Sequence, residues 1–183
     1  LFKGVILAMF VIKEGDGGSY AYMVQLALAR AGYPLIIDGI FGGRTKAAVI
    51  DFQKSRGLAP DGIVGKNTFL ALREFLTGYT YYTVKQGDTL YKIAGRFNSS
   101  VAALRVANEG IDPNNLEVGK QIKVIYGFNL VSDKVQYNSL LGELIAEGLA
   151  ARYPFVGLNI IGRSVLGRPI AALNMGVGAK KVF

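Results

Sequence analysis

The side chains that could carry out chemistry in this chain are carboxylates, lysines and hydroxyls, because the 183-residue sequence has no histidine and no cysteine. Their absence excludes a Ser/His/Asp triad, a Cys/His pair and an ordinary zinc or copper site built from this chain. A glycosidase needs only two carboxyl groups, about 5–10 Å apart across a cleft. Asp38, Asp51 and Asp61 are candidates for such a self-contained enzyme.

Two of these aspartates belong to a duplicated signature. Residues 38–45 (DGIFGGRT) return as residues 61–68 (DGIVGKNT). In each copy the glycines suit a tight turn with positive φ, and the final threonine begins an apolar helical stripe, where its hydroxyl is predicted to cap the helix. Each copy therefore predicts a loop that starts a helix. Equivalent turn positions also give Asp38 and Asp61 a purely structural explanation.

Three short helices are predicted in residues 1–78, over about 19–31, 45–56 and 67–76, and each ends at a glycine. Helices of this length are marginal alone, so their apolar stripes must pack on one another. The apolar run from Gly4 to Ile12 is too short to span a membrane. It favours a buried strand or entry segment over a signal peptide, and any export signal is expected outside this sequence.

This first pattern resembles the peptidoglycan-binding domain found beside many cell-wall hydrolases. The resemblance covers about residues 17–77 and implies an all-α, three-helix domain that binds the bacterial wall. The residues that carry it are Gln25, Leu26, Gly32, Tyr33, Asp38, Gly39, Ile40, Phe41, Gly42, Thr45, Ala48, Val49, Phe52, Gln53, Gly57, Leu58, Asp61, Gly62, Ile63, Val64, Gly65 and Thr68.

Residues 79–126 show a different pattern. The β-prone residues 82–85 lead into a turn, and Thr89 then precedes an apolar helical stripe. Residues 98–100 end this helix and cap another, and residues 121–125 return to strand character. The order β-α-α-β in so short a segment favours two adjacent strands with both helices on one face.

This second pattern resembles a LysM domain over residues 81–125. The residues that carry the resemblance are Tyr82, Val84, Gly87, Asp88, Thr89, Leu90, Ile93, Ala94, Phe97, Leu104, Asn108, Ile111, Pro113, Leu116, Gly119, Gln121 and Ile122. It implies binding of glycans rich in N-acetylglucosamine, as in peptidoglycan or chitin. In the family the sugar lies between the loop after the first strand and the loop before the second. Carried over, the glycan-binding residues are Gly87, Asp88, Thr89 and Leu90 on one side, and Ile111, Asp112, Pro113, Asn114 and Leu116 on the other. Asp88 and Thr89 are also expected to cap the following helix.

The third part, residues 127–183, predicts an incomplete α/β fragment: a helix over about 137–153 followed by strands over about 156–161 and 170–175. Glu143 and Glu147 lie one helical turn apart, and a solvated outer face explains them better than acid–base catalysis. The fragment is similar to the start of a carboxypeptidase A-like zinc peptidase of the γ-D-glutamyl-diamino acid type. The residues that carry this similarity are Arg152, Tyr153, Pro154, Phe155, residues 161–170 and residues 180–183. The similarity implies zinc for the full-length enzyme, with ligands expected after Phe183 and no catalytic or metal-binding residue in this chain.

The net charge of +8 favours a polyanionic partner, and an anionic cell wall fits it better than nucleic acid because the sequence has no run of basic residues. We therefore expect a wall-binding region of a bacterial wall or spore-wall hydrolase. The expected location is extracellular, in the cell wall or spore wall. A self-contained glycosidase and a basic nucleic-acid-binding protein remain the alternatives. The unfinished strands near the end of the chain are expected to favour contact with another chain.

Overall fold

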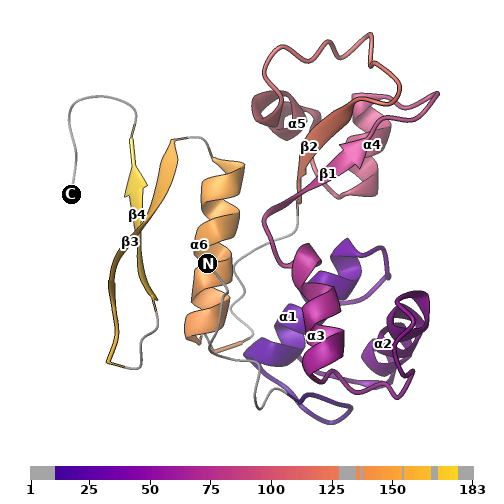
Figure 1. Ribbon diagram of the computed structural model, residues 1–183, viewed down its shortest axis with the longest axis vertical. Helices are drawn as coiled ribbons and strands as arrows, with labels where there is room; N and C mark the ends of the chain where they lie inside the picture. Colours follow the sequence, from indigo (N-terminus) through magenta and orange to yellow (C-terminus); the bar gives the residue numbers. More distant parts are fainter. Residues whose placement is uncertain (1–10, 128–134, 137, 154, 166–168, 177–183) are drawn as a thin grey trace. The chain divides into compact units, whose positions relative to one another are not determined.

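The computed structural model describes residues 11–127, 135–136, 138–153, 155–165 and 169–176 (Figure 1). Most of the apolar run that begins at Gly4 lies outside these ranges, and so do residues 180–183. The chain forms two compact units. The first contains residues 1–76 with 132–142, and the second contains residues 77–131 with 143–183.

Three helices form the N-terminal part of the first unit, as predicted. They are α1 (Ser19–Arg30), α2 (Gly43–Ser55) and α3 (Lys66–Leu72), and the 3₁₀ turn η1 (Arg73–Phe75) continues the last of them. Their apolar stripes face inward and bury Tyr22, Met23, Leu26, Ala48, Val49, Phe52, Phe69, Leu72 and Leu76.

Helices α2 and α3 begin earlier than the sequence pattern predicts. Their N-cap residues are Gly42 and Gly65, which have extended backbones and no side-chain cap. Thr45 and Thr68 lie inside the first helical turn and are buried. The prediction that these threonines cap the helices is wrong, because glycine occupies the cap position and each hydroxyl instead accepts a hydrogen bond from a buried glutamine.

The first of these glutamines, Gln25 on α1, holds the loop before α2. Its Nε2 group donates to Asp38 Oδ1 at 2.8 Å and to the Ile40 carbonyl at 2.9 Å. Its Oε1 atom accepts the backbone N–H of Gly39 at 2.8 Å. Asp38 Oδ1 also accepts the N–H of Ile40 at 2.9 Å, so the carboxylate closes its own turn. A single buried amide therefore satisfies most polar groups of this loop.

The second glutamine, Gln53 on α2, repeats this arrangement in the loop before α3. Its Nε2 group donates to Asp61 Oδ1 at 2.8 Å and to the Ile63 carbonyl at 2.9 Å. Its Oε1 atom accepts the N–H of Gly62 at 2.9 Å. The φ angle of Gly62 is +73°, a conformation that favours glycine. The sequence duplication is thus also a duplication of one hydrogen-bonded structure.

The segment before α1 runs along both loops. Ile12 forms an antiparallel bridge with Val64, with N–H···O distances of 3.1 and 2.9 Å, and its side chain is buried. Further along, the Phe41 N–H donates to the Asp16 carbonyl at 2.9 Å, and the Gly18 N–H donates to the Gly39 carbonyl at 2.8 Å. Residues before the first helix therefore belong to this fold.

The second unit begins with the predicted β-α-α-β order, and this part of the fold prediction is confirmed. Strands β1 (Tyr79–Thr83) and β2 (Gln121–Ile125) pair antiparallel, and α4 (Leu90–Arg96) and α5 (Val101–Ala107) lie between them in sequence. Two predicted caps are present: Thr89 Oγ1 accepts the Lys92 N–H, and Ser100 Oγ accepts the Ala103 N–H, both at 3.1 Å. The prediction that Asp88 also caps α4 is wrong, because its carboxylate accepts the Tyr82 hydroxyl and the Lys85 N–H instead. The core is formed by Val84, Leu90, Ile93, Ala94, Leu104, Ile122 and Val124.

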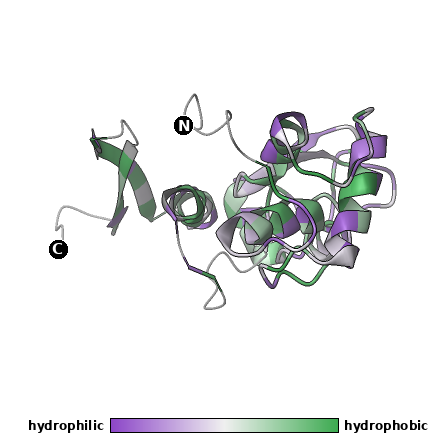
Figure 2. Ribbon diagram, turned by 90° about the horizontal axis from the view of Figure 1, so that it is seen from below, coloured by the Kyte–Doolittle hydropathy of each residue, from purple (hydrophilic) through white to green (hydrophobic). Residues whose placement is uncertain are grey.

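The chain continues with α6 (Ser139–Arg152) and an antiparallel hairpin of β3 (Val156–Arg163) and β4 (Pro169–Met175), with a register shift between Ile160 and Gly162. The predicted helix and hairpin are thus confirmed. Figure 2 shows much of this hairpin in green, the colour of apolar residues. None of the helices in the described ranges combines the length and apolar character needed to cross a bilayer.

Candidate glycan-binding site

The two predicted glycan-binding loops leave the same end of the β1–β2 sheet. Thr83, the last residue of β1, pairs with Gln121, the first residue of β2. Beyond this pair, Val84 donates its N–H to the Lys120 carbonyl at 2.9 Å and accepts the N–H of Gly119 at 2.8 Å. Because the strands are antiparallel, the loop after β1 and the loop before β2 begin side by side.

The two loops also share an apolar floor. Leu90 is 2% exposed and belongs to the core cluster, and Ile111 and Leu116 pack against the same cluster. The Leu90 side chain therefore points into the domain, where it positions the first loop, and only its backbone remains for a ligand. Ile111 and Leu116 anchor the second loop in the same way.

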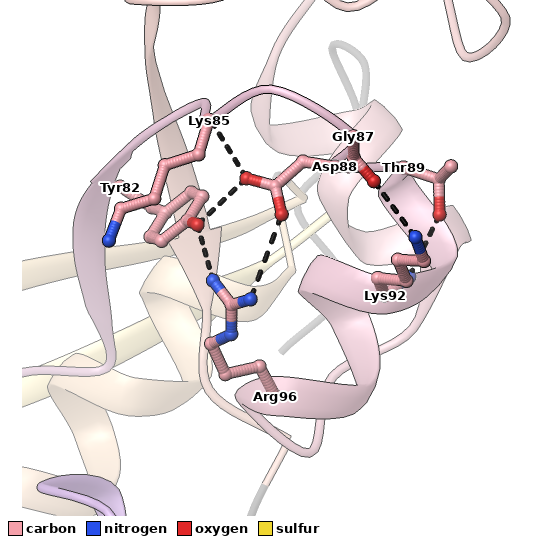
Figure 3. A network of polar contacts seen from close by, with 7 residues as sticks. All are labelled: Tyr82, Lys85, Gly87, Asp88, Thr89, Lys92 and Arg96. Atoms are coloured by element: carbon pink, nitrogen blue, oxygen red, sulfur yellow. Dashed lines mark hydrogen bonds and ion pairs between the residues drawn. The ribbon is translucent and has the colours of Figure 1, made fainter.

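The Asp88 side chain is the centre of the first loop (Figure 3). Its Oδ2 atom accepts the Tyr82 hydroxyl at 2.7 Å and the Lys85 backbone N–H at 2.8 Å. Arg96 Nη2 lies 3.7 Å from Oδ1, and the Arg96 guanidinium also lies 5.1 Å from the centre of the Tyr82 ring. The Asp88 side chain is only 7% exposed. These contacts tie the turn to β1 and α4.

The protonation states of this network agree with its hydrogen bonds. The backbone N–H of Lys85, the Tyr82 hydroxyl and the nearby charge of Arg96 hold the pKa of Asp88 below its usual value. Burial, together with the neighbouring Asp88 carboxylate, raises the pKa of Tyr82. At neutral pH Asp88 is therefore an acceptor and Tyr82 a donor. Asp88 holds the loop in place, and its two oxygens are already engaged within the protein.

Gly87 and Thr89 complete the first loop. Gly87 has a φ of +78°, and its carbonyl accepts a hydrogen bond from Lys92 Nζ at 2.9 Å (Figure 3). Thr89 is exposed, and its hydroxyl caps α4. The Lys92 side chain therefore bridges from the first turn of α4 back to the loop.

In the second loop, Asp112, Pro113 and Asn114 are exposed. Asp112 Oδ1 accepts the Asn114 N–H at 2.9 Å, which fixes a tight turn. The loop is also held at its start by Asn108, whose side-chain amide donates to the Leu104 and Lys123 carbonyls at 2.7 Å. The second loop thus presents exposed polar groups on a turn that is held by its own hydrogen bond.

Sequence reasoning did not find the roles of Lys92 and Arg96. Their spacing of i, i+4 places both side chains on one face of α4, and that spacing was the available signal. Their contacts with Gly87 and Asp88 join residues on different elements. Such contacts cannot be inferred from helical periodicity.

The carboxylates proposed for a self-contained glycosidase have other contacts. Asp38 and Asp61 each accept hydrogen bonds from a glutamine and from their own turn. These bonds, first that from the Ile63 N–H, lower the pKa of Asp61, whereas a glycosidase acid needs a raised pKa. Asp51 is exposed and lies 3.6 Å from Lys54 Nζ. The contacts of Asp38 and Asp61 make them parts of the loop structure.

Two family models match this chain. The model described as a peptidoglycan binding domain matches residues 18–72, and the LysM domain model matches residues 82–124. The chain thus contains a wall-binding helical domain followed by a LysM domain. Domains of these two kinds are cell-wall binding modules of wall hydrolases.

Individual relatives match parts of the chain. A zinc D-Ala-D-Ala carboxypeptidase of Streptomyces albus G is 48% identical over 63 residues, which is 32% of this chain and 24% of that protein. An endolysin of Bacillus phage PZA is 30% identical over 158 residues, which is 77% of this chain and 60% of that protein. A peptidoglycan-binding protein structure from Clostridioides difficile is 40% identical, covers 36% of this chain and 41% of that one, and has a TM-score of 0.35. The chain spans less than two thirds of each of these proteins.

Proposed function

We propose that this chain anchors a bacterial wall hydrolase to peptidoglycan, and that the LysM domain binds N-acetylglucosamine units between residues 87–90 and residues 111–116. One observation supports this proposal: both loops leave one end of the sheet and pack on one core, an arrangement that favours a binding site between them. Backbone groups and small polar side chains there suit the alternating polar and apolar edges of an acetamido sugar.

Titration of the chain with N-acetylglucosamine oligomers is expected to give saturable binding. Asn114→Trp places a large side chain on the exposed second loop. We expect it to weaken binding and to raise the dissociation constant at least about tenfold. The matched variant Asn67→Trp changes an exposed asparagine of α3 and should leave this constant unchanged. Calorimetry or NMR chemical-shift changes measure the dissociation constants of both variants. No saturable signal with the unsubstituted chain up to millimolar oligomer would refute the glycan assignment.

We further propose that the whole protein is a zinc-dependent peptidase that cleaves γ-D-glutamyl–diamino acid bonds. Support comes from the resemblance of residues 152–155 and 161–170 to the start of that family, and from the helix and hairpin found there. The side chains present do not fit a zinc site. The sequence has no histidine, and among the described residues no three His, Cys, Asp or Glu side chains are grouped to hold a metal ion. The proposal therefore assigns zinc chemistry to residues after Phe183.

A cleavage assay tests this second proposal. Wall peptides that contain a γ-D-glutamyl–diamino acid bond should remain intact with the 183-residue chain. The longer encoded protein should cleave them and should lose this activity in the presence of a chelator. Cleavage by the 183-residue chain alone, or chelator-resistant cleavage by the longer protein, would contradict the proposal.

A further inference from the structure

Three cationic residues, on the loop that follows β1 and on α4, lie at the first loop of the LysM domain (Figure 3). Lys85, Lys92 and Arg96 are all exposed. Lys92 and Arg96 contact the loop through their side chains, and Lys85 contacts it through its backbone N–H. Lys92 Nζ lies 2.9 Å from the Gly87 carbonyl, and Arg96 lies beside Asp88. Lys85 is close enough for its charge to lower the pKa of Asp88. We call Lys85, Lys92 and Arg96 the cationic rim.

The rim is only partly neutralised within its own network. Asp88 is the one carboxylate that contacts the rim among the interactions drawn in Figure 3, and its side chain is 7% exposed. Its oxygens are engaged with Tyr82, the Lys85 backbone and Arg96. Three cations therefore face solvent beside a single inward-facing carboxylate. Among the residues drawn in Figure 3 the cations outnumber the carboxylates, and the net charge of +8 has the same sign.

Lys92 is the member of the rim best placed to act on a bound glycan. Its hydrogen bond to the Gly87 carbonyl fixes its ammonium group beside a residue proposed to contact the sugar. An ammonium group has three donors, so Lys92 keeps hydrogen-bonding capacity for a ligand. The side chain already has a defined position, so a ligand that uses it loses little additional side-chain entropy on binding.

We propose that the cationic rim makes this LysM domain selective for glycan strands that carry carboxylates, and that Lys92 is the main specificity-determining residue. This inference rests on the proposed glycan function. In peptidoglycan, every second sugar carries a lactyl group linked to a peptide with free carboxylates, whereas chitin is an uncharged polymer of N-acetylglucosamine. A positive rim beside the sugar site distinguishes these two polymers by charge.

The test compares two ligands of equal sugar length. One is a chitin oligomer, and the other is a peptidoglycan fragment that keeps its peptides and comes from wall material freed of teichoic acid. Binding is followed by the NMR signals of residues 82–124 in the full chain, so that binding by residues 18–72 is not counted. At low ionic strength we expect the peptidoglycan fragment to bind there about five- to tenfold more tightly, and raising the salt to roughly 0.3 M should remove most of this preference. Removal of teichoic acid ensures that phosphate groups do not contribute.

Three variants assign the effect to Lys92. Lys92→Met keeps an aliphatic side chain without the charge and should abolish the preference, while Lys92→Arg should retain most of it. Arg105→Met removes an equal charge from an exposed position on α5 and should leave the preference unchanged. If Lys92 had only a structural role, Lys92→Met would instead weaken the binding of both ligands by the same factor.

Two results would overturn the inference while the proposed function stands: equal, salt-independent binding of both ligands, or a preference that survives Lys92→Met. Binding of neither ligand would refute the proposed function itself, and the inference with it.

Discussion

Replacing Gln53 by alanine is expected to lower the free energy of unfolding of the first unit by about 2–4 kcal/mol. The side chain is 1% exposed and contacts Asp61 Oδ1, the Ile63 carbonyl and the Gly62 N–H. Its removal takes the partner of the buried Gly62 N–H and one of the hydrogen bonds to Asp61 Oδ1 and to the Ile63 carbonyl. An unsatisfied buried polar group costs about 1–3 kcal/mol. Water that enters the small cavity would recover part of this loss.

Chemical denaturation followed by the NMR signals of α2 and α3 would measure this change. Gln86→Ala is the matched control, because it removes the same side chain from an exposed turn, and we expect its effect to stay within about 0.5 kcal/mol. Gln25→Ala should resemble Gln53→Ala, since both glutamines make the same contacts. A loss below about 1 kcal/mol in both variants would show that the glutamines are not the main support of the loops.

The sequence predicted the elements of this fold because local patterns determine them. The apolar stripes of α1, α2 and α3 follow helical periodicity, and they are buried. Thr89 and Ser100 cap their helices because each stands directly before the first helical residue. The same reasoning failed at Thr45 and Thr68, where two glycines already occupy the cap positions.

The side-chain interactions that join separate elements, in the first unit and in the candidate site, were harder to predict. Gln25 and Asp38 are far apart in sequence, and so are Tyr82 and Arg96, yet each pair is joined by a side-chain hydrogen bond. The identity of Asp88 was predicted from a motif, but its engagement with β1 and α4 depends on how the two elements pack. A motif therefore locates a site more readily than it assigns the role of each side chain.

Replacing Phe52 by alanine is expected to cost about 3–5 kcal/mol, most of the stability of a small domain. The Phe52 ring is 1% exposed, and its centre lies 6.3 Å from that of Tyr33 and 6.1 Å from that of Phe75, both in edge-on geometry. The Arg56 guanidinium lies 5.2 Å from the same ring. Removal of the ring leaves a cavity among side chains that cannot all move to fill it.

The LysM domain should remain folded in the Phe52→Ala variant, because its core is a separate cluster around Ile93 and Leu104. NMR spectra recorded across a thermal transition would show the signals of residues 18–72 disappearing while those of residues 82–124 persist. Phe155→Ala serves as the control, since this phenylalanine is 47% exposed and its removal should change stability by less than about 1 kcal/mol. Simultaneous loss of both sets of signals would mean that the two domains unfold as one unit, so that the proposed boundary between residues 78 and 81 does not separate independent folds.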